Sequence, residues 1–246
     1  MRINLYTQQS VSTLAASAAA QSTTVLSTAR SAGQTAQQAT VNLSIDAITR
    51  SQAANLYNRY FPVREGFSAD ALGLGTALPQ ATSSSTGLSG DAIGVDARKR
   101  MDAVYAAMEA SGNPFSYDSY EGQDTNTLFG SLDRRSLSAV ANNQGGLFSS
   151  QEQMLAKSVM DQQQSLASGL YSGPIRLEST FKSVTDSNVS QVLAASFLDN
   201  VSDEEKATPS WQLARALVLP AAPTYTQDTV ADALAKVLVA TGLGSR

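Results

Sequence analysis

The chain has 246 residues, 42% of them hydrophobic, so it is long enough to bury the core of one good-sized domain or of two small ones. It contains neither cysteine nor histidine, which excludes disulfides, thiolate and imidazole metal sites, and Ser-His or Cys-His nucleophile pairs. A net charge of −4 and the lack of any basic run argue against a nucleic-acid partner.

Residues 1–40 are rich in Ser, Thr, Ala and Gln, and their only charged side chains are Arg2 and Arg30. This low hydrophobicity predicts a flexible arm, and small apolar residues at loose heptad spacing predict that a protein partner orders it. Polar residues 7–10 interrupt what would be the apolar part of a signal peptide. The segment therefore gives no clear export signal, and a cytoplasmic and an exported protein both fit.

Helical spacing predicts that residues 41–62 form a docking helix, which Pro62 ends. Residues 73–90 are rich in Gly, Ser and Thr, and they predict a loop or linker that marks a domain boundary. We expect residues 91–246 to form a helical domain.

The first helix expected in this domain carries Met101 and Tyr105 on one face and ends at Gly112. The alternating pattern that is typical of strands does not occur, so we expect helices alone. No run of about 18 apolar residues occurs either, so we expect no membrane span. The predicted fold class is all-α, an irregular helical domain. Its later helices are expected within residues 131–146, 150–171, 187–201, 202–219 and 226–244.

Residues 141–152, with the sequence ANNQGGLFSSQE, align with the twelve-residue calcium loop of an EF-hand. Gly146 falls at position six, where glycine allows the sharp turn, and Phe148 falls at the apolar position eight. Glu152 falls at position twelve, where the carboxylate binds calcium with both oxygens. Residues 132–160 therefore resemble a degenerate EF-hand-like helix-loop-helix.

The resemblance implies calcium ligands at loop positions three, seven, nine and twelve: Asn143, Leu147, Ser149 and Glu152. Ala141 and Gly145 replace the usual oxygen ligands at positions one and five, so the loop keeps a single carboxylate. Because calcium affinity follows the charge and number of the ligands, we expect weak calcium binding or none, and no other cofactor.

Ordinary helix chemistry explains the same residues without a metal. Ser149 and Glu152 have the S-x-x-E spacing of a capping box, in which each side chain accepts a backbone N–H of the other residue. Gly145 and Gly146 are common helix terminators. The acidic sequence SDEE, residues 202–205, likewise fits a capped helix start better than a metal cluster.

The function that the sequence favours is a non-enzymatic helical interaction or structural protein, which contacts a protein partner through residues 1–40. One alternative is a weak calcium-responsive module of the EF-hand type. A second alternative follows from the low charge and the lack of cysteine, which resemble exported filament, flagellar-type and phage structural proteins. A hydrolase has only the S-x-x-K spacing of residues 179–182 in its favour, without the companion motifs of that enzyme class.

Overall fold

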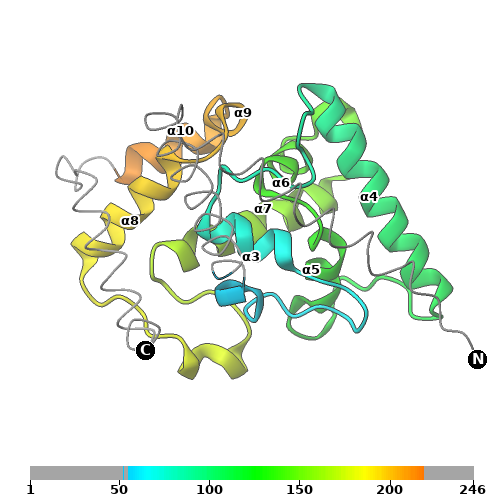
Figure 1. Cartoon of the computed structure of the whole chain (residues 1–246), viewed down its shortest axis with the longest axis horizontal. Coiled ribbons are helices and arrows are strands. Elements are labelled where there is room, and N and C mark those ends of the chain that lie inside the picture. Colours follow the sequence, from blue (N-terminus) through cyan, green and yellow to red (C-terminus); the bar gives the residue numbers. More distant parts are fainter. Residues whose placement is uncertain (1–51, 53–54, 219–246) are drawn as a thin grey trace, which may run out of the picture. The chain divides into compact units, whose positions relative to one another are not determined.

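The computed structural model describes residue 52 and residues 55–218 of the chain (Figure 1). The chain divides into two compact units, Met1–Thr49 and Arg50–Arg246, and all described residues belong to the second. Three predicted segments lie outside the described residues: the arm over residues 1–40, residues 41–51 and 53–54 of the docking helix, and the helix expected over residues 226–244.

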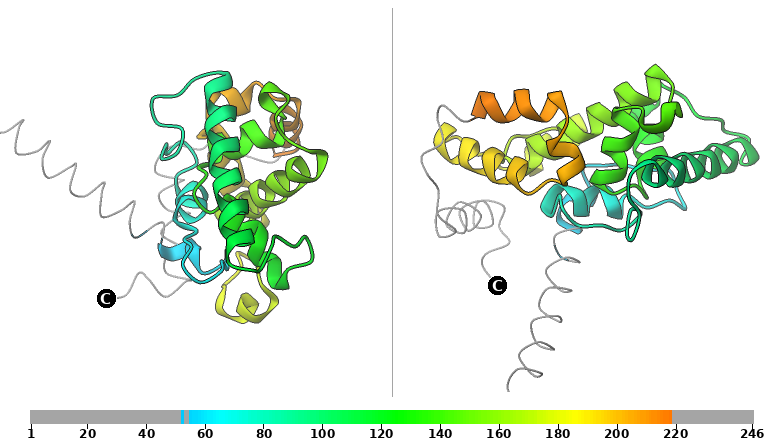
Figure 2. Two further views of the ribbon diagram at one scale, coloured as in Figure 1. Left: turned by 90° about the vertical axis from the view of Figure 1, so that its right-hand side faces the viewer. Right: turned by 90° about the horizontal axis from the view of Figure 1, so that it is seen from above.

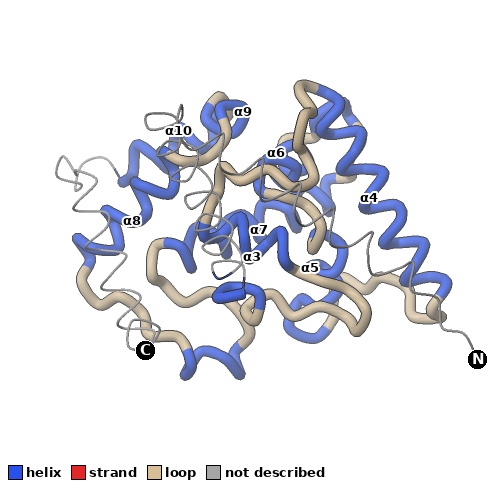
Figure 3. The backbone as a smooth tube through the Cα atoms, in the orientation of Figure 1, coloured by secondary structure: helices blue, strands red, loops and turns tan. Residues whose placement is uncertain are grey.

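The described residues form helices joined by loops and contain no strand, which confirms the predicted all-α fold class (Figure 3). None of these helices combines the length and the apolar character that crossing a bilayer requires. The α-helices are α3 (Asp70–Ala77), α4 (Asp91–Ala110), α5 (Gln123–Phe129), α6 (Arg134–Ala141), α7 (Ser150–Ala167), α8 (Ser187–Asp199), α9 (Asp203–Lys206) and α10 (Pro209–Val218). Three short 3-10 helices are η1 (Tyr120–Gly122), η2 (Gln144–Gly146) and η3 (Ile175–Thr180).

Helix α4 follows the sequence prediction closely. Its inward face buries Met101 and Met108 completely, while Tyr105 is half-buried. Gly112 takes the left-handed conformation, with φ of 74°, and its N–H donates to the carbonyl of Glu109. A glycine after the last turn satisfies the free helix carbonyls at no steric cost, so α4 stops where the sequence predicts.

The hydrophobic core lies between α3, α4, α5, α6 and α7 and the segment that precedes α3. Helix α6 packs against α4 and α7, and α3 packs against α7. Burial of each large apolar side chain contributes about 1.5–3 kcal/mol, so this core supplies most of the favourable free energy of folding. Its largest fully buried members include Tyr60, Phe61, Leu72, Met101, Leu128, Phe129, Leu132, Leu137 and Leu166.

Helix α3 lies partly within the segment that the sequence predicts as a loop. The prediction is wrong for residues 73–77, which form the second half of α3. Its two glycines are poor helix formers, but Gly75 packs closely on α7: a Cβ there would stand 2.8 Å from Nε2 of the buried Gln163. Tertiary contact therefore overrides the low helix propensity of this segment.

Two further boundaries differ from the prediction. Helix α5 occupies a stretch for which the sequence gives no helix signal. Helix α7 ends at Ala167, four residues earlier than expected, because Gly169 turns the chain with φ of 75°. A Cβ on Gly169 would lie 2.3 Å from the side chain of Val184, so only glycine allows the returning chain to approach so closely.

Helix α9 begins at the cap that the sequence predicts, and a side-chain hydroxyl also caps the start of α10. The hydroxyl of Ser202 accepts the N–H of Glu205, and the hydroxyl of Thr208 accepts the N–H of Trp211. Trp211 is half-buried, and its indole N–H donates to the carbonyl of Leu198 on α8 at 2.8 Å. This bond holds α10 beside α8 (Figure 2).

Candidate functional site

The loop between α6 and α7 turns through three left-handed residues. Asn143, Gly145 and Gly146 have φ values of 51°, 73° and 70°. Asparagine and glycine are the residue types that adopt this region most readily, so the sequence NNQGG encodes the turn directly. Gly146 stands four residues before the start of α7, and Phe148 is buried behind it.

The capping box predicted for α7 is present. The hydroxyl of Ser149 accepts the N–H of Glu152 at 3.3 Å, and Oε2 of Glu152 accepts the N–H and the hydroxyl of Ser149 at 2.8 and 2.9 Å. These bonds satisfy amides that a helix start otherwise leaves without a partner.

The carboxylate of Glu152 also makes two long-range bonds to α4. Its Oε1 lies 2.7 Å from Nη1 of Arg98 and accepts the hydroxyl of Tyr105 at 3.2 Å. The Glu152 side chain is only 9% exposed, and Arg98 also binds Asp102 at 2.8 Å. Both oxygens of the single carboxylate in the loop are therefore engaged by protein groups.

These partners decide the protonation of Glu152. Burial raises the pKa of its carboxyl group, but the hydrogen bonds from Arg98 and from the N–H and hydroxyl of Ser149 lower it by more. The pKa of Glu152 in the folded protein is thus below its usual value. The glutamate is charged at neutral pH and is balanced by the arginine.

The four predicted calcium ligands have separate tasks in the structure. Ser149 and Glu152 come together in the capping box, whereas Oδ1 of Asn143 accepts the N–H of Phe148 at 2.9 Å. The Leu147 side chain is partly exposed. Among the described residues, no three acidic side chains gather in an arrangement that would hold a metal. Weak calcium binding or none at this loop remains a prediction.

Helix α4 lies directly against the loop. A Cβ on Gly94 would stand 3.0 Å from the carbonyl oxygen of Gln144 in η2, so the glycine permits a close approach. The sequence places Tyr105 on the inner face of α4, but it gives no sign that Arg98 reaches Glu152, 54 residues away. Only the packing of α4 on α6 and η2 brings this pair together.

The loop that precedes α4 repeats the backbone pattern of the loop that precedes α7. Gly87 has φ of 73° and stands four residues before α4, as Gly146 stands before α7. A leucine follows the glycine in both loops. Helix α3 packs on α7 and α4 packs on α6, so two helix-loop-helix units, α3–α4 and α6–α7, lie side by side.

Asp133 holds the loop of the first unit. Its Oδ2 accepts the N–H groups of Ser83 and Ser85 and the hydroxyl of Ser85, each at 2.8 Å, while its Oδ1 caps α6 through the N–H of Ser136. Burial raises the pKa of the Asp133 carboxyl group, but these bonds lower it by more, so the pKa is below its usual value. Residues 78–90 are therefore a loop fixed to α6.

A buried ion pair joins α6 to α9. Nη2 of Arg134 lies 2.6 Å from Glu205, and the two side chains are 3% and 5% exposed. Arg134 also donates to the carbonyl of Met160 and to Gln163, and it lies over the ring of Phe197. The arginine is thus surrounded by structural partners.

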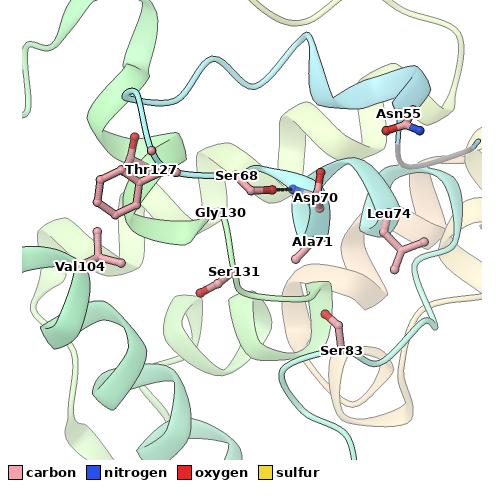
Figure 4. Close-up of a pocket in the computed structure, with 12 residues that line it drawn as sticks. Asn55, Ser68, Asp70, Ala71, Leu74, Ser83, Val104, Thr127, Gly130 and Ser131 are labelled. Carbon is pink, nitrogen blue, oxygen red and sulfur yellow. Dashed lines mark hydrogen bonds between the residues drawn. The ribbon is translucent and has the colours of Figure 1, made fainter. Parts of the chain in front are cut away.

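An open pocket of about 670 Å³ lies between the start of α3 and the turn that joins α5 to α6 (Figure 4). Asp70 is the one ionisable residue among those that line it; its carboxylate accepts the amide of Asn58, and its N–H donates to the hydroxyl of Ser68. The Thr127 hydroxyl accepts the N–H of Arg64 and donates to a helix carbonyl. The other lining residues are Asn55, Gly66, Phe67, Ala71, Leu74, Ser83, Val104, Gly130 and Ser131.

The residues of the S-x-x-K spacing lie elsewhere on the surface. Ser179 belongs to η3 and Lys182 follows it, and both are exposed.

Comparison of the chain with protein-family models, with curated proteins and with solved structures gives no match. The candidate site is therefore interpreted from its own geometry.

Proposed function

We propose that the chain is a non-enzymatic helical interaction or structural protein whose EF-hand-like helix-loop-helix, α6–α7, is held together by protein side chains in place of a metal. The observation that carries the proposal is the engagement of Glu152 by Arg98. A glutamate at the last loop position binds calcium with both oxygens, and here both oxygens accept protein donors.

Charge supports the same conclusion. A calcium ion at Glu152 would have to displace a guanidinium and would then be repelled by it at close range. Among the four predicted ligand positions, Asn143 supplies the remaining amide oxygen, and that oxygen accepts the N–H of Phe148. The ion pair therefore does the task that a metal does in a calcium-binding loop: it fixes α7 relative to the neighbouring helices.

The pairing of the two helix-loop-helix units supports a common role for them as one rigid module. Asp133 fixes the loop of the first unit, and the Arg98–Glu152 pair fixes the loop of the second. Each unit thus supplies the residue that fixes the loop of the other. Asp133 of the second unit binds the loop of the first, and Arg98 of the first unit binds Glu152 in the second.

A weak calcium-responsive module is the second candidate, and the backbone of the loop favours it. The left-handed Gly146, the buried Phe148 and the helix start at Ser150 all stand where a calcium loop has them. Calorimetric titration with calcium separates the candidates. We expect no binding heat; a heat that disappears in Glu152→Gln would favour the calcium-responsive module.

The interaction role is assigned to residues 1–40 and is tested with the full-length chain. A variant in which these residues are replaced by a Gly-Ser sequence of equal length keeps the helical module intact. We expect the wild type to bind partner proteins, or to assemble with itself as a filament-type component, and the variant to lose this binding with an unchanged melting temperature. Equal binding by the two proteins would show that residues 1–40 do not make the interaction.

A further inference from the structure

Helix α10 presents an apolar stripe to the surroundings. Leu213 and Leu217, four residues apart on one side of the helix, are 65% and 74% exposed. Side chains at this spacing lie one above the other. No residue of α10 is fully buried, although its sequence is strongly amphipathic.

The opposite side of α10 is already engaged. Trp211 bonds to Leu198 of α8, and Arg215 pairs with Asp199 of α8 at 2.8 Å. These contacts set the rotation of α10 and direct the leucines away from α8. The leucine stripe is thus a surface on which another apolar element fits.

The chain that follows α10 has the pattern of such an element. In the sequence, Pro220 and Pro223 are predicted to end a helix, and apolar residues then recur at helical spacing: Val230, Leu234, Val237 and Leu238. Residues 219–228 would form the connection, close to the usual length of about 2–8 residues between helices of a bundle.

An antiparallel return aligns the two apolar patterns. When two helices pack antiparallel, a step of four residues forward on one helix faces a step of four residues back on the other. A register that places Val230 opposite Leu217 therefore also places Leu234 opposite Leu213, so both leucines of α10 face apolar residues. The four-residue spacing on each helix makes the match continuous.

We propose that residues 229–240 of this chain dock as a helix, antiparallel to α10, on the surface formed by Leu213 and Leu217. The connection begins where α10 ends, which gives this segment a high effective concentration at the surface compared with any separate molecule. The proposal is independent of the calcium loop and of residues 1–40.

Cross-linking tests the predicted register in the full-length protein. The chain contains no cysteine, so a pair of introduced thiols is the only reactive pair. We expect a short bis-maleimide to join Leu213→Cys to Leu234→Cys within one chain. The control pair is Glu109→Cys, exposed on α4, with Leu234→Cys, which should react much more slowly.

The remaining outcomes each contradict the proposal. Cross-links between chains would mean that a second copy covers the surface. Equal reaction of the two pairs, or no cross-link in either, would mean that residues 229–240 do not dock there. A normal Trp211 emission spectrum verifies that each variant keeps α10 on α8.

Hydrogen exchange gives a second measurement that requires no cysteine. Residues 229–240 should exchange at least tenfold more slowly in the wild type than in Leu213→Asp/Leu217→Asp, while Gln212→Asp, at an exposed polar position of α10, should keep the protection. Protection that is absent from the wild type, or that survives the double substitution, would overturn the proposal.

Discussion

Nη1 of Arg98 on α4 lies 2.7 Å from the carboxylate of Glu152 in the first turn of α7. Arg98 also packs near the ring of Phe148, the buried aromatic residue of the same loop. One arginine therefore holds both the charged end and the apolar centre of the loop between α6 and α7.

Loss of the negative charge at Glu152 should destabilise the protein. Glu152→Gln keeps one acceptor oxygen but removes the ion pair with Arg98, and we expect the free energy of unfolding to fall by about 1–3 kcal/mol. Chemical denaturation measures this change. The control is Glu109→Gln, at an exposed position of the same helix as Arg98, where we expect a change below about 0.5 kcal/mol.

Asp133 should control both stability and the protection of the loop before α4. Asp133→Ala removes a helix cap together with three bonds to Ser83 and Ser85, so we expect a loss of about 2–4 kcal/mol. Limited proteolysis should then cleave within residues 78–90, a region that we expect to resist cleavage in the wild type. Equal resistance in the variant and in the exposed control Asp118→Ala would disprove the anchoring role.

The buried pair of Arg134 and Glu205 should be sensitive to the loss of one partner. Glu205→Ala leaves an uncompensated guanidinium in the interior, which costs about 3–5 kcal/mol. Replacement of both residues by apolar ones, as in Arg134→Met/Glu205→Leu, should recover a large part of that loss. Urea unfolding of the three proteins measures it, and a double variant as unstable as the single variant would contradict the expectation.

Stability should fall in acid. Asp124, Asp133 and Glu152 have folded-state pKa values below the usual 3.8 for aspartate and 4.5 for glutamate. The stability that these groups contribute is present above the usual values and is lost as the pH falls through the lowered ones. Asp161, whose pKa burial raises, acts in the opposite direction and reduces the total effect.

Urea unfolding between pH 7 and pH 3 checks this dependence. We expect a nearly constant free energy of unfolding down to about pH 5 and a decline below it. The decline should be smaller in Asp133→Asn, because this variant has no carboxyl group at position 133 to protonate. A wild type whose stability rises below pH 4 would show that the lowered pKa values do not dominate.

Local helix chemistry made much of the fold predictable. The caps at Ser149, Ser202 and Thr208 and the stop at Gly112 depend on residues within four positions of one another, so a short sequence window contains the whole cause. The all-α class follows from the same periodic patterns.

Long-range pairs were not predictable in the same way. Arg98 and Glu152 are 54 residues apart, and Asp133 reaches back 48 residues to Ser85. Either charged residue would suit a solvated helix face equally well. The resemblance of residues 141–152 to a calcium loop likewise describes the backbone turn and leaves open the partner of the carboxylate, because that partner comes from another helix.

Helix α3 illustrates the opposite effect. Its glycines lower the local preference for a helix, yet Gly75 lies in close contact with α7, where a Cβ would stand 2.8 Å from Nε2 of Gln163. The reason for the glycine is its contact with the neighbouring helix. A single sequence does not show which distant helices contact each other.

The melting temperature in calcium and in chelator tests the central claim most directly. If the Arg98–Glu152 pair replaces the metal, wild type and Glu152→Gln should each melt at the same temperature in millimolar calcium as in a chelator. Binding with calcium at 100 times Kd would add about 2.7 kcal/mol to the free energy of unfolding, which is easily detected. A wild-type melting temperature that calcium raises, with no rise in Glu152→Gln, would contradict the account.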